Sequence, residues 1–180
     1  MKHKQKIQQT QRLLTINKNK NMSKTNQVLY SSSNYITTQD VPDELALAIS
    51  FSGCPMHCKG CHSAFTWDPL FGELFTDEIF RSIIKKNKYA SCVLFYGGEW
   101  KMERLIELIN IAKEFKLKVC LYTGLNLEQV DERLINILDY LKVGPYIEKL
   151  GGLNKKTTNQ KMYKIENGKL TDITNKFYQS

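Results

Sequence analysis

Short apolar runs alternate with helical patterns along most of this 180-residue chain. Four apolar runs predict buried strands, at residues 45–51, 91–96, 117–123 and 139–147, and the last of them runs into a turn. Three amphipathic patterns predict helices between them, at residues 76–88, 101–115 and 127–138. A further short strand or hairpin arm is expected at residues 162–165. Strands that are apolar on both faces and alternate with helices indicate an α/β protein, with a mainly parallel sheet covered by helices.

The charge of the chain is unevenly distributed. The net charge is +8, yet residues 1–27 hold seven basic residues and no acidic one, which leaves the remainder near neutrality. This segment is rich in Lys, Gln and Asn, which cannot build a core, so we expect a disordered basic leader at residues 1–27. The leader could touch RNA or an anionic surface. For the single folded domain, expected at residues 28–175, we predict no nucleic-acid partner.

Targeting signals are not visible in the sequence. It has neither the apolar run of a signal peptide nor the ~20 apolar residues of a membrane span, so we expect a cytoplasmic protein without a membrane partner. Thiols stay reduced in the cytoplasm. Among the five cysteines, Cys92 and Cys120 lie within apolar runs and are expected to be core residues. The other three lie close together, which indicates metal or redox chemistry.

The stretch "SFSGCPMHCKGCHSAF" carries those three cysteines. We refer to Cys54, Cys58 and Cys61 as the loop cysteines, and to residues 52–62 as the cysteine loop. With His57 or His62 they could supply four zinc ligands, although zinc sites usually join two ligand pairs across a longer spacer. A c-type haem signature is also present, but it leaves Cys54 unexplained. Three thiolates spaced C-x3-C-x2-C can instead hold three irons of a 4Fe-4S cluster and leave the fourth iron open.

Ligands of parallel sheets bind at the loops that follow the strands. Here those loops carry the cysteines, "GGEW" at residues 97–100 and "TGL" at residues 123–125, and we expect them to lie side by side. Gly97 and Gly98 have no side chain, so a ligand could approach their backbone closely. A Val at Gly98 is therefore expected to weaken ligand binding far more than it weakens the fold.

The loop cysteines and "YGGEW" resemble the motifs of the radical S-adenosylmethionine superfamily. Within it, the chain is similar to the activating proteins of anaerobic ribonucleoside-triphosphate reductases, over about residues 28–170. Four segments carry the narrower resemblance: "DVPDELALAISFSGCPMHCKGCHSAFTWD", "LYTGL", "VGPYIEKL" and "TNQKMYKI".

This resemblance implies a short, incomplete (β/α) barrel that binds a 4Fe-4S cluster and S-adenosylmethionine. It implies reductive cleavage of S-adenosylmethionine and formation of a glycyl radical on the reductase, with a reduced donor such as flavodoxin. The loop cysteines would ligate the cluster. S-adenosylmethionine would contact residues of the first two loops, namely Gly60, Cys61, His62, Gly97, Gly98 and Glu99.

The sequence departs from the superfamily pattern at two positions. Gly60 stands where an aromatic residue often packs on the adenine, so His62, Phe65 or Trp67 is expected to take that role. Trp100 stands where Pro usually follows "GGE". Two other functions stay open: activation of a different, formate-lyase-like glycyl-radical enzyme, and a zinc-binding interaction module without catalysis.

Overall fold

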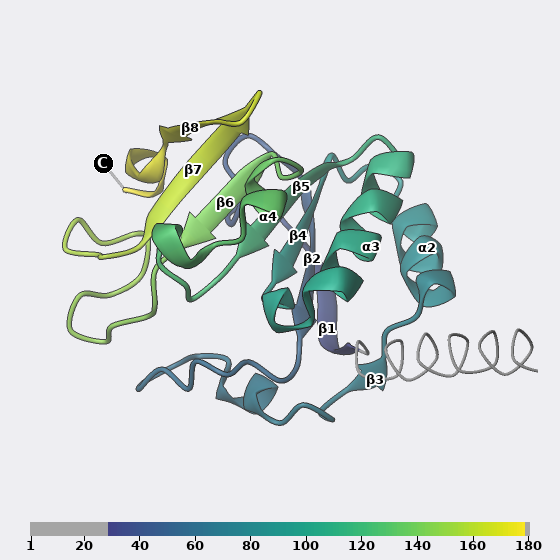
Figure 1. Ribbon diagram of the computed structural model, residues 1–180, viewed down its shortest axis with the longest axis horizontal. Helices are drawn as coiled ribbons and strands as arrows, with labels where there is room; N and C mark the ends of the chain where they lie inside the picture. Colours follow the sequence, from purple (N-terminus) through teal and green to yellow (C-terminus); the bar gives the residue numbers. More distant parts are fainter. Residues whose placement is uncertain (1–28, 179–180) are drawn as a thin grey trace, which may run out of the picture.

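The computed structural model describes residues 29–178, so the predicted leader lies outside the described part of the chain. Within these residues one sheet has eight strands, in the order β3-β1-β2-β4-β5-β6-β7-β8 (Figure 1). The strands are β1 (Tyr30–Thr37), β2 (Ala46–Phe51), β3 (Glu73–Leu74), β4 (Cys92–Tyr96), β5 (Lys118–Tyr122), β6 (Tyr140–Val143), β7 (Lys161–Glu166) and β8 (Lys169–Asp172). The α-helices are α2 (Asp77–Lys86), α3 (Met102–Glu114) and the one-turn α4 (Glu132–Ile135). Short 3-10 segments are η1 (Ala64–Trp67), η2 (Glu99–Lys101), η3 (Leu127–Gln129) and η4 (Thr174–Phe177).

The centre of the sheet is parallel and its two margins are antiparallel. β2, β4, β5 and β6 run parallel to one another, as the alternation of strands and helices predicts. β1 and β3 extend the sheet antiparallel on one side, and β7 and β8 do so on the other. The α/β class is thus confirmed, and the sheet as a whole is mixed. Closure into an incomplete barrel stays a prediction.

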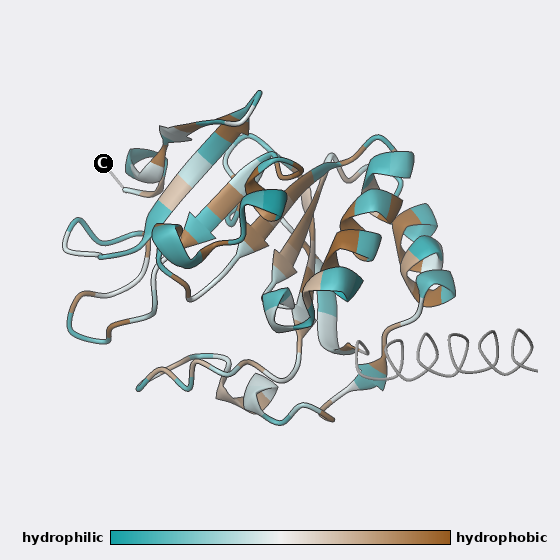
Figure 2. Cartoon of the chain, in the orientation of Figure 1, coloured by the Kyte–Doolittle hydropathy of each residue, from teal (hydrophilic) through white to brown (hydrophobic). Residues whose placement is uncertain are grey.

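Both faces of the central strands are buried, because alternate side chains enter two separate apolar clusters. One cluster holds Leu47, Val93 and Leu121 and packs against α2 and α3, which cover one face of the sheet. The other cluster holds Ala48, Leu94 and the two strand cysteines, Cys92 and Cys120. Both strand cysteines are fully buried, which confirms their place in the core. Figure 2 shows the central strands in apolar brown, and the outward turns of α2 and α3 in polar teal.

The helix predicted at residues 76–88 is confirmed, and the one at residues 127–138 is wrong. The side chain of Thr76 accepts a hydrogen bond from the Ile79 amide and caps α2, as its sequence indicates. Residues 127–138 instead form η3 and α4, with Val130 extended between them. Asn126 caps the first segment and Asp131 caps the second. The apolar residues that suggested one continuous helix therefore belong to two short helical segments, separated by an extended residue.

A buried carboxylate ties the chain together at the edge of the sheet where the parallel strands begin. Glu44 accepts hydrogen bonds from Ser91 Oγ at 2.6 Å, Lys118 Nζ at 2.5 Å and Tyr140 OH at 2.8 Å. Burial raises the pKa of the Glu44 carboxyl, but the bonds from Lys118, Ser91 and Tyr140 outweigh it and hold the pKa below its usual value. We call these four residues the Glu44 cluster. It joins the segment before β2 to the starts of β4, β5 and β6.

Within residues 29–178, no helix combines the length and the apolar character needed to cross a membrane.

Candidate functional site

Three loops meet at the edge of the sheet where the parallel strands end. Ser50 of β2 pairs with Tyr96 of β4, which pairs with Tyr122 of β5, so these strands end level with one another. The cysteine loop, residues 97–100 and residues 123–125 follow them directly, and the amide of Gly97 donates to the Tyr122 carbonyl at 2.9 Å. The predicted gathering of these loops is therefore confirmed.

The cysteine loop is anchored to the sheet at its start. The Ser52 amide donates to the Tyr30 carbonyl at 2.9 Å, and the amides of Gly53 and Cys54 both donate to the Thr66 carbonyl, at 2.6 and 3.1 Å. Thr66 lies in η1, whose first turn is closed by a bond from Thr66 Oγ1 to the Ser63 carbonyl. The loop and η1 therefore form one unit, which runs along one side of the sheet in Figure 1.

The loop cysteines are partly exposed, and Cys54 has a perturbed thiol. Burial raises the pKa of the Cys54 thiol, and the charges of Glu99, Cys58 and Cys61 raise it further. The loop alone therefore favours the neutral thiol at Cys54. Iron binding would reverse this preference, because a metal cation stabilises the thiolate that ligates it.

A zinc ion and an iron–sulfur cluster need different arrangements of these side chains. A zinc ion needs its ligands within about 2.0–2.3 Å of one point. No group of three or more His, Cys, Asp or Glu side chains within residues 29–178 gathers in this way. A 4Fe-4S cluster binds each thiolate at a separate iron, so its ligands stand further apart. Among the described residues no ligand set for a single zinc ion is gathered, and the choice between zinc and the cluster rests on the comparisons below.

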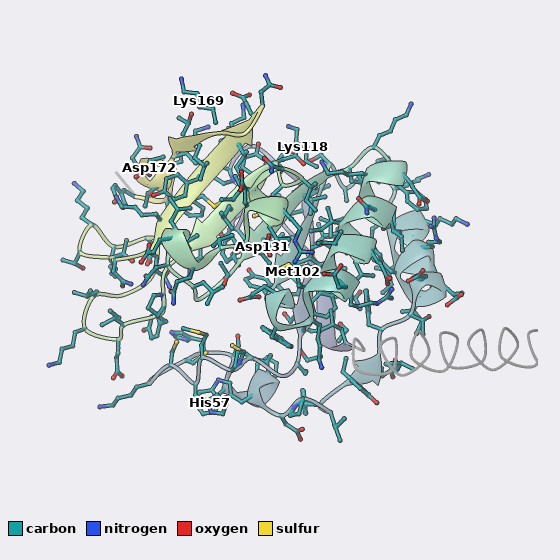
Figure 3. The ribbon with its side chains drawn as sticks, in the orientation of Figure 1. His57, Met102, Lys118, Asp131, Lys169 and Asp172 are labelled. Carbon is teal, nitrogen blue, oxygen red and sulfur yellow. The ribbon has the colours of Figure 1, made fainter. Side chains whose placement is uncertain are left out.

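The aromatic side chains near the loop have different surroundings. His57 stacks on Trp67, with ring centroids 4.7 Å apart and planes inclined by 18°, and it lies on the side of the loop away from the sheet (Figure 3). Phe65 pairs with Phe71. His62 instead meets Tyr146 edge-on at 5.7 Å. Of the three predicted adenine-packing residues, His62 alone lines the cavity described below.

The two glycines after β4 are needed by the protein's own packing, which corrects the expectation for Gly98. Both have positive φ angles, +77° at Gly97 and +103° at Gly98. A Cβ at Gly97 would lie 2.4 Å from the Trp100 ring, and one at Gly98 would lie 2.9 Å from the Phe51 ring. A side chain at Gly98 would therefore clash with the core and strain the backbone, whether or not a ligand is present. Contact of S-adenosylmethionine with the backbone of Gly97 and Gly98 stays a prediction.

Glu99 is fixed by Thr123 through one carboxylate oxygen only. Its Oε1 accepts from Thr123 Oγ1 at 2.5 Å, while Oε2 is buried and has no hydrogen-bond partner. Burial raises the pKa of Glu99, and the bond from Thr123 opposes that rise. A buried oxygen without a partner is costly, so Oε2 retains the capacity to accept a hydrogen bond.

The third loop contacts the first directly. A Cβ at Gly124 would lie 2.9 Å from Cγ of Met56, so the side chain of Met56 rests on the bare backbone of Gly124. Met56 lies between Cys54 and Cys58. The cysteine loop thus packs against the backbone of Gly124, the glycine of "TGL", through the side chain of Met56.

A cavity of about 1340 Å³ lies beside these loops. Cys61 and His62 line it from the cysteine loop, and Tyr96 and Tyr122 line it from the ends of β4 and β5. The segment between β6 and β7, residues 144–160, faces the cysteine loop across it, and Glu148 lies against Gly60. Asn159 and Gln160 stand beside Gly144, at the end of β6. All four segments that carry the narrower resemblance therefore contribute residues to the lining of the cavity.

Lys142 is a residue of this cavity that the sequence interpretation missed. It lies within β6, between two apolar neighbours, and its side chain lines the cavity in a buried position. Its Nζ donates to the carbonyls of Gly144 at 2.9 Å and Thr123 at 3.5 Å. Burial lowers the pKa of Lys142 to about 8, against the opposing charges of Cys58, Glu99 and Cys61. A lysine inside an apolar strand was the signal that could have identified it.

The sequence matches the family described as "4Fe-4S single cluster domain" over residues 45–166, well over half of the chain. The chain belongs to this family. The match includes all three loop cysteines, Glu99 and Lys142, and it confirms the predicted iron–sulfur character. Together with the C-x3-C-x2-C loop, the match makes the chain an iron–sulfur protein.

Two further likenesses are more limited. Over 73 residues the chain is 32% identical to the pyruvate formate-lyase-activating enzyme of Clostridium pasteurianum. The matched stretch covers 37% of this chain and 31% of that enzyme. The chain thus matches less than a third of that relative's length. The crystal structure of QueE from Escherichia coli superimposes with a TM-score of 0.47 at 18% identity, over 62% of this chain and 69% of that one.

Proposed function

We propose that this protein is an activating enzyme that binds a 4Fe-4S cluster through three cysteines, cleaves S-adenosylmethionine reductively and generates a glycyl radical on a partner enzyme. The observation that carries the proposal is the meeting of the cysteine loop and the Gly97-Gly98-Glu99 turn at one sheet edge, beside a large cavity that Cys61 and His62 line. When bound, the reduced cluster would supply the electron that splits S-adenosylmethionine into methionine and a 5′-deoxyadenosyl radical. That radical would take a hydrogen atom from a glycine α-carbon of the partner.

The chain's own residues would bind and orient the small molecule. Glu99 offers a buried acceptor at the end of β4, and His62 offers a ring at the cavity wall. The cavity exceeds the roughly 300–1,000 Å³ of typical small-molecule pockets. It therefore has room for a ligand together with a peptide segment. Holding both reactants in one site is what a short-lived radical requires.

The partner we propose is anaerobic ribonucleoside-triphosphate reductase, with a reduced protein such as flavodoxin as donor and the cytoplasm as location. Support comes from the segments at residues 121–125, 143–150 and 158–165, which resemble reductase-activating proteins and gather around the cavity. A formate-lyase-like partner is the second candidate, and the 73-residue likeness to a pyruvate formate-lyase-activating enzyme favours it.

The test mixes anaerobically purified, reduced protein with S-adenosylmethionine and each candidate partner in turn. We expect a glycyl signal in electron paramagnetic resonance on the reductase, and none when Cys58→Ser replaces the wild-type protein. A signal on the formate-lyase-like partner alone would overturn the reductase assignment. Purified protein that holds zinc and no iron or sulfide would overturn the whole proposal.

A further inference from the structure

Trp100 lies between the first two loops of the site and contacts both of them. A Cβ at Gly53 would lie 3.2 Å from Trp100 Nε1, and a Cβ at Gly97 would lie 2.4 Å from Trp100 Cη2 and 2.6 Å from Cζ3. The five-membered ring of the indole therefore faces Gly53, and the six-membered ring faces Gly97. A single side chain thus connects the start of the cysteine loop with the turn after β4.

Both of these positions require glycine. Gly53 has a φ angle of +94° and Gly97 one of +77°, in the left-handed region that residues with a side chain rarely adopt. An added Cβ at Gly97 would also overlap the six-membered ring, because carbon atoms pack at about 3.5–4.0 Å. The two bare backbones and the indole therefore form one packed unit.

The other side of Gly53 is closed by η1 and the residues that follow it. The Gly53 amide donates to the Thr66 carbonyl at 2.6 Å, and a Cβ at Gly53 would lie 3.3 Å from the Cβ of Pro69. Gly53 is thus enclosed between Trp100 and Pro69, and it directly precedes Cys54. The direction in which the chain enters the cysteine loop depends on this enclosure.

The indole is itself anchored to the core. Trp100 is partly buried and packs against the apolar cluster that α2 and α3 cover. The Lys101 amide donates to the Gly98 carbonyl at 2.9 Å, which closes the η2 turn that carries Trp100. The cysteine loop is therefore braced by the core through Trp100, in addition to its backbone hydrogen bonds.

We propose that Trp100 is a positioning residue for the iron–sulfur cluster, whose indole holds the entry to Cys54 against the turn after β4 and excludes water on that side. This inference rests on the cluster of the proposed function. In the competing role, Trp100 only fills space at the edge of the core and adds stability. Solvent exposure helps to set the reduction potential of such clusters, because water stabilises the extra negative charge of the reduced form. Loss of the indole should therefore make the cluster easier to reduce.

A redox titration of cluster-loaded protein, followed by electron paramagnetic resonance, separates these roles without turnover. At the potential where the wild-type cluster is half reduced, we expect the Trp100→Ala cluster to be about three-quarters reduced or more. This is roughly a threefold change in the ratio of reduced to oxidised cluster. Trp100→Phe keeps a ring at this position but is too small to meet both glycines, so its reduced fraction should lie between those of the wild type and Trp100→Ala.

Phe115→Ala is the matched control. Phe115 is also a partly buried aromatic residue on the same apolar cluster, but it lies at the C-terminal end of α3, away from the cysteine loop. Its loss should lower the melting temperature and leave the reduced fraction at one half. An equal shift in Phe115→Ala, or no shift in Trp100→Ala, would overturn the inference.

Failure of the inference can be told from failure of the proposed function. Wild-type protein that holds zinc and no iron or sulfide overturns the proposed function, and the inference falls with it. A wild type that loads and titrates, beside a Trp100→Ala variant with the same reduced fraction, overturns only the role of Trp100. Should Trp100→Ala retain too little iron to titrate, Trp100→Phe decides, because a reduced fraction of one half in that variant would also overturn the role.

Discussion

Replacing Gly124 with Ala should disturb the cysteine loop from the neighbouring strand. The added Cβ would lie 2.9 Å from Cγ and 3.4 Å from Cε of Met56. Carbon atoms pack at about 3.5–4.0 Å, so Met56 must retreat by roughly 0.6–1.1 Å. Overpacking of this kind costs about 1–3 kcal/mol, and the flexible Met side chain favours the lower half of that range. Because Gly124 has no positive φ angle, backbone strain adds nothing.

The displacement should be visible in two measurements. A cost of about 1–2 kcal/mol lowers the melting temperature of a chain of this size by roughly 2–8 °C. Iron and sulfide content after anaerobic reconstitution should also fall, because Met56 lies between two cluster ligands. Gly152→Ala is the matched control, since its Cβ would meet only Asn154 Oδ1, at 3.8 Å, and it should change neither quantity.

The double variant Gly124→Ala/Met56→Ala decides whether the reasoning holds. Met56→Ala removes the atoms that the new Cβ would strike. The double variant should therefore recover cluster content relative to Gly124→Ala alone. A double variant that loads no more iron than the single one would refute the steric argument and leave Gly124 with some other role.

Three other outcomes are expected. Single Ser substitutions of the loop cysteines should abolish cleavage of S-adenosylmethionine while Cys92→Ser and Cys120→Ser retain it, as product chromatography would show; cluster loss in either strand-cysteine variant would contradict the assignment. Gly98→Val should destabilise the fold by about 3 kcal/mol or more, through positive φ and the clash with Phe51, and lost ligand affinity at an unchanged melting temperature would count against this. Glu44→Gln should cost about 2 kcal/mol at pH 7, because an amide cannot accept from all three donors. The folded pKa of Glu44 is lowered, so its carboxylate stabilises the protein above about pH 4.3, and this contribution is lost as the pH falls through the folded pKa. Denaturant unfolding should show the unfolding free energies of the wild type and Glu44→Gln converging in acid. A difference in unfolding free energy that stays constant with pH would exclude the charge as the cause.

The sequence predicted the parallel centre of the sheet well, because strands buried on both faces must be apolar throughout. It did not predict β1, since "YSSSNYIT" is polar and only partly buried and lies toward the margin of the sheet. Such a strand forms because β2 offers it a partner, which a local pattern does not reveal. β8 was missed for the same reason, since its exposed residues gain their structure from pairing with β7.

Sequence reasoning identified the site residues whose type is required by the chemistry. It missed the roles of residues that depend on tertiary packing. The spacing of the loop cysteines needs no tertiary information. The role of Gly98 depends on Phe51, which is 47 positions away in the sequence, so the glycine alone could not distinguish a ligand approach from a crowded core. Lys142 carries no motif at all, and only the structure reveals its burial at the wall of the cavity.

The Glu44 cluster lies at one end of the parallel strands and the loop cysteines lie at the other, as the positions of Lys118 and His57 in Figure 3 show. Many enzymes lose activity when their thermal stability is raised, because the active-site residues are often strained or destabilising in the folded state. In this protein the residues that stabilise the fold at the Glu44 cluster are different from the residues of the candidate site. Directed evolution toward heat tolerance could therefore concentrate on the starts of β4, β5 and β6, and we expect the gains made there to leave the reactive end unaltered.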